Sequence, residues 1–206
     1  SREILELAAV FATTSDSMVV EAEADHVLAI AVDPSKAMRM TGQRPVLICA
    51  RDRREEAQVI VRIVAQLLKG TSGFKGFDQP IKPEEIGLLY ARKDPDTVIP
   101  ELKQQLERHA PVVWISDKSD RSARYRVNEP GLKLQTIHSA KGLQYRVVIL
   151  LWADQLPSTF DDSDEVADRC LMYVALTRPE DLLVMTTSKP SSFIQRIQAS
   201  GKVEVC

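Results

Sequence analysis

The stretch Leu134 to Leu150, LQTIHSAKGLQYRVVIL, decides the fold of this chain. It begins with the β-branched and apolar residues typical of a strand, breaks at a small polar loop, and returns to an apolar strand pattern at Val147–Leu151. Open α/β sheets bind ligands at the carboxyl ends of their strands, so the loop is a candidate ligand site. It carries hydroxyl groups, an imidazole, an ammonium group and a flexible glycine: Thr136, His138, Ser139, Lys141 and Gly142.

Strand and helix patterns alternate on both sides of this stretch. We expect strands at 44–51, 85–91, 112–116, 133–138, 146–153 and 182–187, with a further short strand near 26–31. Helical spacing predicts helices at 52–69, 101–109, 165–177 and 191–199. Asp52 and Glu55 form a capping-box pair, and Pro100 suits the first position of its helix. This alternation predicts an α/β fold with a mostly parallel sheet.

The composition is that of an ordinary globular protein, long enough for one well-cored domain. Of the 206 residues, 44% are hydrophobic and 27% are charged, and the formal net charge is −2. This charge excludes a strongly basic, histone-like binder, but a local groove of lysine and arginine could still contact nucleic acid. We expect residues 44–206 to form the domain and residues 1–43, a helix and an irregular lead-in, to belong to it.

Cysteine usage and hydropathy indicate the compartment. Cys49, Cys170 and Cys206 lack the spacing of metal ligands, so no metal site is expected. An odd number of cysteines without a signal peptide favours reduced thiols and a cytoplasmic protein. The longest apolar run, Val147–Ala153, is too short to cross a bilayer. Because the chain begins within a helical pattern and lacks an initiator methionine, we expect it to be an excised fragment.

Two runs resemble motifs of one enzyme family. Thr136–Leu143, TIHSAKGL, resembles motif V of the superfamily 1 DNA helicases, the UvrD/Rep/PcrA group, and Tyr173–Arg178, YVALTR, resembles their motif VI. The resemblance implies the second RecA-like domain of such a helicase, with helices on both faces of a mostly parallel sheet. In the intact enzyme it implies 3′→5′ movement along DNA, driven by ATP.

The resemblance implies which motif V residues touch ligands. DNA contacts are expected at Thr136, His138, Ser139 and Lys141, which offer the hydroxyl groups and cations that hold phosphates. Gly142 and Gln144 are expected to lie at the nucleotide. The family usually has glutamate at the position of Gln144. Glutamine retains hydrogen bonding to a ribose hydroxyl but lacks the charge.

Arg178 resembles an arginine finger, which reaches a γ-phosphate bound by a neighbouring domain. Such fingers accelerate phosphoryl transfer by about 10³–10⁵ because they neutralise charge on the transferring group. The alternative is a surface arginine favoured by the dipole at a helix C-terminus. We expect Val166, Cys170 and Tyr173 to share the buried face of the preceding helix, so that Arg178 leaves the helix end at the interdomain surface.

A third, weaker resemblance concerns residues 88–92, LLYAR, which are similar to motif IV. The family reads Leu-Tyr-Arg, and an inserted alanine leaves either Tyr90 or Arg92 out of register. We expect Arg92 to be a second γ-phosphate sensor that closes on the phosphate with Arg178, against the alternative of a solvated arginine. Tyr90 is a candidate core residue, and core packing is also expected for Trp114 and Trp152.

The chain lacks the parts of a complete ATP site. It has no GxxxxGK[ST] loop and no acidic pair after an apolar strand, so ATP and Mg²⁺ would be held mainly by another domain. We therefore expect no ATP hydrolysis by this chain alone. The expected partners are single-stranded and duplex DNA and an N-terminal RecA-like domain of the same polypeptide, with no membrane.

Three other interpretations stay open at this stage. The chain could be a non-catalytic nucleic-acid-binding or interaction module on a RecA-like scaffold, because fold alone does not fix function. It could be the helicase part of a nuclease–helicase fusion, as in the RecB group. A flavodoxin-like small-molecule domain fits less well, since residues 50–54, ARDRR, are not a glycine-rich loop.

Overall fold

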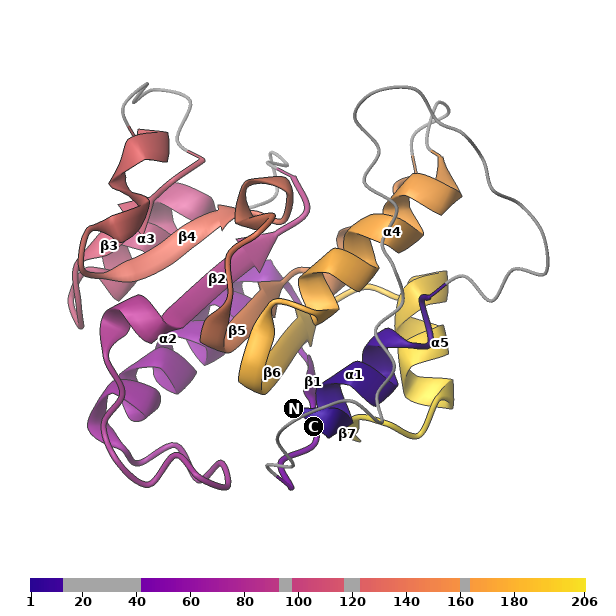
Figure 1. Cartoon of the computed structure of the whole chain (residues 1–206), viewed down its shortest axis with the longest axis horizontal. Coiled ribbons are helices and arrows are strands. Elements are labelled where there is room, and N and C mark those ends of the chain that lie inside the picture. Colours follow the sequence, from indigo (N-terminus) through magenta and orange to yellow (C-terminus); the bar gives the residue numbers. More distant parts are fainter. Residues whose placement is uncertain (13–41, 93–97, 117–122, 160–163) are drawn as a thin grey trace.

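The computed structural model describes residues 1–12, 42–92, 98–116, 123–159 and 164–206, and its centre is a seven-stranded sheet (Figure 1). The strands are ordered β3-β4-β2-β5-β6-β1-β7, and all their pairings are parallel. Their bounds are β1 Val46–Cys49, β2 Ile86–Tyr90, β3 Val112–Trp114, β4 Leu132–Thr136, β5 Tyr145–Leu151, β6 Pro179–Thr187 and β7 Glu204–Val205. The predicted α/β class with a mostly parallel sheet is confirmed.

Helices cover both faces of this sheet. The bounds are α1 Arg2–Ala8, α2 Arg53–Lys69, α3 Ile99–Leu106, α4 Glu165–Leu176 and α5 Ser192–Ala199. Helices α2 and α3 share one apolar cluster with alternate residues of the strands, and α1, α4 and α5 share the other. In the described parts of the chain, short 3-10 helices join these elements: η2 Pro83–Glu85, η3 Ala123–Asn128, η4 His138–Ala140 and η5 Ala153–Gln155. Both faces of the central strands are therefore buried, as their near-continuous apolar sequences predict.

The ends of α2 follow from its capping residues. The Asp52 carboxylate accepts the backbone N–H groups of Arg54 and Glu55, both at 2.9 Å, and Gly70 at φ 69° ends the helix. The predicted capping box is only half formed. The Glu55 carboxylate accepts the N–H of Arg51 at 2.7 Å instead of that of Asp52. This hydrogen bond joins the first turn of α2 to Arg51, in the connection between β1 and α2.

Three local predictions are wrong. The strand predicted at 133–138 ends at Thr136, because His138 already belongs to η4. Helix α3 begins at Ile99, which makes Pro100 its second residue. Val166 is 58% exposed, since the buried side of α4 lies nearer its C-terminus, at Met172, Tyr173, Ala175 and Leu176. The strand expected near 26–31 lies outside the described residues.

No helix in the described residues has the length and apolar character that a membrane span needs.

A glycine and a tyrosine fit together on one face of the central strands. A Cβ atom at Gly87 of β2 would lie 2.5 Å from a ring carbon of Tyr145, the first residue of β5. The Tyr145 hydroxyl accepts a hydrogen bond from Gln135 Nε2 at 2.6 Å, and burial raises the pKa of Tyr145. The start of β5 is thus held against β2 and β4 by packing and by one buried hydrogen bond.

Replacing Gly87 by alanine should therefore overpack this contact. We expect the free energy of unfolding to fall by about 1–3 kcal/mol, as for added methyl groups in packed cores, measured by urea denaturation. Gln58→Ala, at an exposed position of α2, serves as the control and should change the free energy of unfolding by less than about 0.5 kcal/mol. A Gly87 variant as stable as the wild type would contradict this tight packing.

Candidate functional site

Three hydroxyl groups meet at the carboxyl edge of the sheet, where β3 and β4 end. Ser116 Oγ lies 2.9 Å from Ser139 Oγ and donates to Thr136 Oγ1 at 3.3 Å, and Thr136 Oγ1 lies 2.9 Å from Ser139 Oγ. The backbone N–H of Thr136 donates to Ser116 Oγ at 2.9 Å, and that of Ser139 donates to Thr136 Oγ1 at 3.2 Å. Such hydroxyl groups are common partners of nucleic-acid phosphates. We call Ser116, Thr136 and Ser139 the hydroxyl cluster.

The turn η4 carries the exposed part of motif V. Ile137 and Ala140 are fully buried, and the N–H of Ile137 donates to a backbone carbonyl of β2 at 2.9 Å. His138, Ser139 and Lys141 are exposed on the same turn. The structure therefore brings the residues predicted to contact DNA together, next to the hydroxyl cluster.

The connection from η4 to β5 runs from the carboxyl edge of the sheet back to its amino edge. Both β4 and β5 pair in parallel with β2, so β5 must start at the edge where β4 started. Residues 141–144 make this return. Gly142 adopts φ 78°, which a side chain would strain. Gly142 and Gln144 are exposed, and Leu143 is half-buried between them.

Arg178 follows α4 and lies at the amino edge beside this connection. Its Nε donates to the Val174 carbonyl at 3.1 Å, and its terminal nitrogens donate to the Leu143 carbonyl at 3.3 Å and to Thr177 Oγ1 at 3.1 Å. The N–H of Tyr145 donates to the Arg178 carbonyl at 3.1 Å. Burial lowers the pKa of Arg178, and no ion pair among the described residues offsets its charge. The predicted nucleotide residues Gly142 and Gln144 flank its Leu143 contact.

Arg92 lies at the opposite edge of the sheet. It follows the carboxyl end of β2, its terminal nitrogen donates to Ser158 Oγ at 2.5 Å, and its N–H donates to Gln155 Oε1 at 3.4 Å. The seven residues of β5 between the two edges span about 20 Å. The prediction that Arg92 and Arg178 close on one phosphate is therefore wrong for this arrangement, since the sheet separates them.

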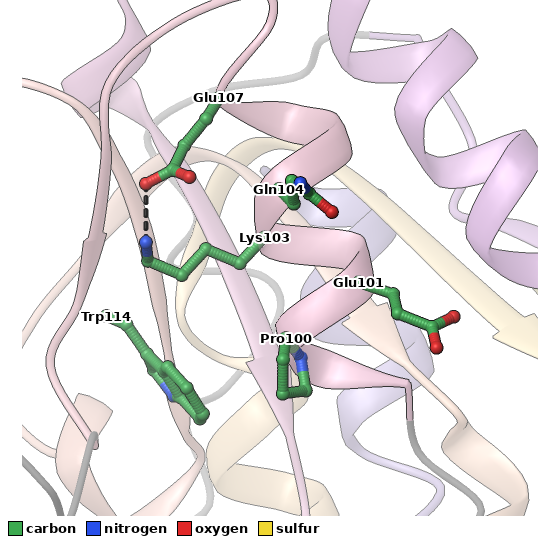
Figure 2. A pocket seen from close by; sticks show the side chains of 6 residues that line it. All are labelled: Pro100, Glu101, Lys103, Gln104, Glu107 and Trp114. Carbon is green, nitrogen blue, oxygen red and sulfur yellow. Dashed lines mark hydrogen bonds and ion pairs between the residues drawn. The ribbon is translucent and has the colours of Figure 1, made fainter.

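The candidate core aromatics have different environments. Tyr90 and Trp152 are fully buried and pack edge to face, with ring centroids 6.3 Å apart. Trp114 is only half-buried, donates its indole N–H to the Tyr90 hydroxyl at 2.9 Å, and lines an open pocket with α3 (Figure 2). Core packing is thus confirmed for Tyr90 and Trp152, and Trp114 covers the edge of the sheet.

Comparison with known proteins fits this arrangement of motifs. Residues 115–190 match the family model of the UvrD-like helicase C-terminal domain. The ATP-dependent DNA helicase PcrA of Staphylococcus epidermidis is 33% identical over 79 residues, which cover 34% of this chain and 11% of that protein. PcrA of Staphylococcus aureus is 31% identical over 93 residues, which cover 35% of this chain and 12% of that protein. The chain resembles the UvrD-like helicases.

The fold comparison agrees. The C-terminal domain of a possible DNA helicase from Lactobacillus plantarum WCFS1 superposes with a TM-score of 0.52 at 15% identity, covering 79% of this chain and 84% of that one. The predicted RecA-like fold is thereby confirmed. The matched segments cover only 11% and 12% of the two PcrA proteins.

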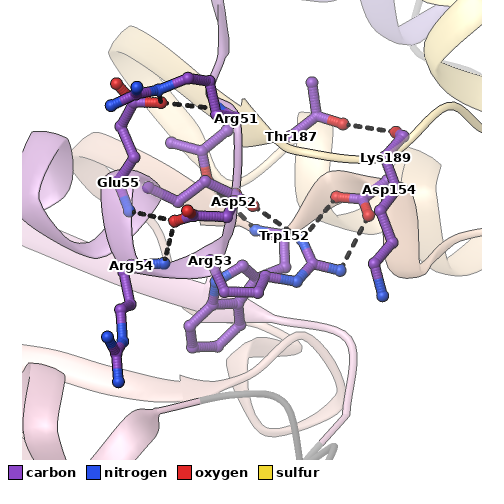
Figure 3. Close-up of polar contacts among 11 residues, drawn as sticks. Arg51, Asp52, Arg53, Arg54, Glu55, Trp152, Asp154, Thr187 and Lys189 are labelled. Atoms are coloured by element: carbon purple, nitrogen blue, oxygen red, sulfur yellow. Dashed lines mark hydrogen bonds and ion pairs between the residues drawn. The ribbon is translucent and has the colours of Figure 1, made fainter.

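Two groups of residues at the carboxyl edge were not predicted from the sequence. Ser116 completes the hydroxyl cluster, and its only signal was its position directly after a strand. Arg53 donates to both carboxylate oxygens of Asp154 at 2.8 Å and to Glu56 at 2.8 Å, with 12% of its side chain exposed (Figure 3). Nothing local in the sequence links Arg53 to Asp154, because the two lie 101 positions apart.

The groups at the amino edge suit an anion better than a metal ion. The guanidinium of Arg178 and the amide of Gln144 supply N–H donors, which fit phosphate and ribose oxygens. No group of three or more His, Cys, Asp or Glu side chains in the described residues could hold a metal ion. The residues present therefore fit part of a nucleotide site, and they do not fit a magnesium site.

Removing the Thr136 hydroxyl should loosen η4. In Thr136→Val the Ser139 N–H loses its acceptor, so we expect the free energy of unfolding to fall by about 1 kcal/mol and amide exchange at Ser139 to accelerate. Thr71→Val, at an exposed threonine, is the matched control and should change stability by less than about 0.5 kcal/mol. Unchanged exchange at Ser139 would show that the hydroxyl cluster does not hold the turn.

Proposed function

We propose that this chain is the second motor domain of a UvrD-like, ATP-dependent DNA helicase with 3′→5′ polarity. It would grip single-stranded DNA at the carboxyl edge of its sheet and complete the ATP site of a preceding RecA-like domain at the amino edge. The observation that carries the proposal is the connection from Thr136 to Tyr145. One short segment joins the hydroxyl cluster to the Leu143 carbonyl, which Arg178 contacts at 3.3 Å.

On the DNA side, η4 offers three kinds of phosphate partner. The hydroxyl groups of Thr136 and Ser139 donate hydrogen bonds, and His138 and Lys141 project from the same exposed turn. Phosphate contacts of this type position a strand without reading its sequence. A motor that moves along DNA needs this kind of grip.

On the nucleotide side, Arg178 has the features of a movable cation. Its present partners are neutral oxygens, which bind a guanidinium more weakly than a phosphate does. Exchange of the Leu143 carbonyl for a phosphate oxygen would therefore be favourable when the cleft between the domains closes. Arg178 would then stabilise the charge on the phosphoryl group, while Gln144 would bind the sugar.

ATP and Mg²⁺ would be held mainly by the preceding domain. Bound ATP supplies the phosphoryl group whose charge differs before and after hydrolysis, which biases a two-state cleft. Release of Arg178 from the Leu143 carbonyl would change the conformation of the connection between η4 and β5. This chain would thereby transmit the state of the nucleotide to the DNA grip.

The test is DNA-stimulated ATP hydrolysis by the complete polypeptide. In Arg178→Ala we expect turnover to fall about a hundredfold or more with nucleotide binding retained, because only transition-state stabilisation is lost. Arg62→Ala, at an exposed arginine in the middle of α2, is the matched control and should hydrolyse ATP like the wild type.

Three other results would change the interpretation. Unchanged turnover in Arg178→Ala would reject the finger. An equal loss of nucleotide affinity and turnover would make Arg178 a binding residue only. Absence of hydrolysis in the wild-type polypeptide would favour a non-catalytic nucleic-acid-binding module.

A further inference from the structure

A second polar crevice lies at the carboxyl edge, between the neighbouring parallel strands β6 and β1. The connection after β1 leads to α2 on one face of the sheet, and that after β6 leads to α5 on the other. Where adjacent connections diverge in this way, α/β sheets form ligand-binding crevices. An open pocket is present here, lined by Arg51, Asp52, Arg53, Arg54, Val98, Ser188 and Lys189.

The floor of this crevice is fixed by a buried ion cluster. Arg53 is held by Asp154 and Glu56, whose side chains are 1% and 0% exposed. These two carboxylates lie behind Arg53 and offset its charge. Removing Arg53 would leave two buried carboxylates without their cation, so the cluster supports the crevice rather than binding a ligand.

Two cations extend from this floor. Arg54 and Lys189 are exposed, and Figure 3 shows their side chains on either side of Arg53 and Trp152, one from each connection. Arg51, also exposed, is paired with Glu55 at 3.1 Å. The hydroxyl oxygen of Ser188 is buried and has no hydrogen-bond partner in the described part of the chain. The crevice therefore combines two outward cations with a hydroxyl that has hydrogen-bonding capacity to spare.

We propose that this crevice binds two phosphodiester groups of the DNA strand held by η4, through Arg54, Lys189 and Ser188. The inference rests on the proposed function and extends its DNA track across the sheet. The hydroxyl cluster and the crevice occupy the same edge. Four strand-to-strand steps, from β4 through β2, β5 and β6 to β1, separate them by about 19 Å.

The character of the crevice favours a nucleic-acid strand over a small anion. The first N–H groups of α2 are already taken by the Asp52 carboxylate, so no backbone cradle is left for a free phosphate. The cations stand on exposed side chains at an open surface, which suits the backbone of a strand that passes over it. Arg92, which follows the carboxyl end of β2, lies between the two contact points on the same edge of the sheet.

The test measures binding of labelled oligothymidines to the 206-residue chain by fluorescence anisotropy over a range of salt. For the double variant Arg54→Ala/Lys189→Ala with dT12, we expect about tenfold weaker binding at low salt. The slope of log K against log salt should fall by about 1.4, because each phosphate contact on a single strand contributes about 0.7. The matched control, Arg62→Ala/Lys82→Ala, removes two exposed cations elsewhere and should keep the wild-type slope.

Oligonucleotide length and a second pair of variants separate the possible outcomes. A dinucleotide cannot span about 19 Å, so the crevice variant should bind dT2 like the wild type, whereas His138→Ala/Lys141→Ala should weaken binding of both lengths. A wild-type salt slope for the crevice variant with dT12 would overturn the crevice and leave the η4 grip standing. If neither pair of variants affected binding, both the crevice and the proposed function would fail.

Binding of a small anion in the crevice would give a different experimental result. If inorganic pyrophosphate bound the wild type and was lost in the crevice variant, while the dT12 slope stayed unchanged, the crevice would be a small-anion site and the inference would be wrong. Thermal unfolding of each variant checks folding, and exposed positions should change stability by less than about 0.5 kcal/mol.

Discussion

The parallel pairing of β4, β2 and β5 is the constraint on which the rest of the site depends. Because β4 and β5 run in the same direction, the chain must leave the carboxyl edge at Thr136 and return to the amino edge before Tyr145. A tight hairpin cannot make this connection. Motif V is this connection, and it therefore has one end beside the hydroxyl cluster and the other beside Arg178.

Because motif V runs from one edge of the sheet to the other, the two edges carry different functional groups. At the amino edge, the half-buried guanidinium of Arg178 rests on neutral oxygens and lies next to exposed Gly142 and Gln144. At the carboxyl edge lie hydroxyl groups and exposed basic side chains, from η4 to Lys189. Such a division suits a domain that senses a nucleotide on one side and holds a strand on the other.

The carboxyl edge is also tied together by polar contacts between distant segments. Arg53 joins the start of α2 to Asp154 of η5, and Gln155 of the same turn accepts the N–H of Arg92. Arg92 in turn contacts Ser158. Buried, charge-assisted pairs of this kind are costly to break, so they hold three connections in fixed relative positions. The crevice between β6 and β1 depends on that rigidity.

The sequence by itself determined the alternation of strands and helices, the motif V and VI runs, and the absence of a phosphate-binding loop. These properties are local, because periodicity, capping residues and short motifs are each contained in a few neighbouring residues. Only the tertiary structure decided that Arg92 and Arg178 lie on opposite edges, that Val166 is exposed, and that Arg53 pairs with Asp154. Strand order and the direction of each connection fix these relations, and both follow from packing between segments far apart in the chain.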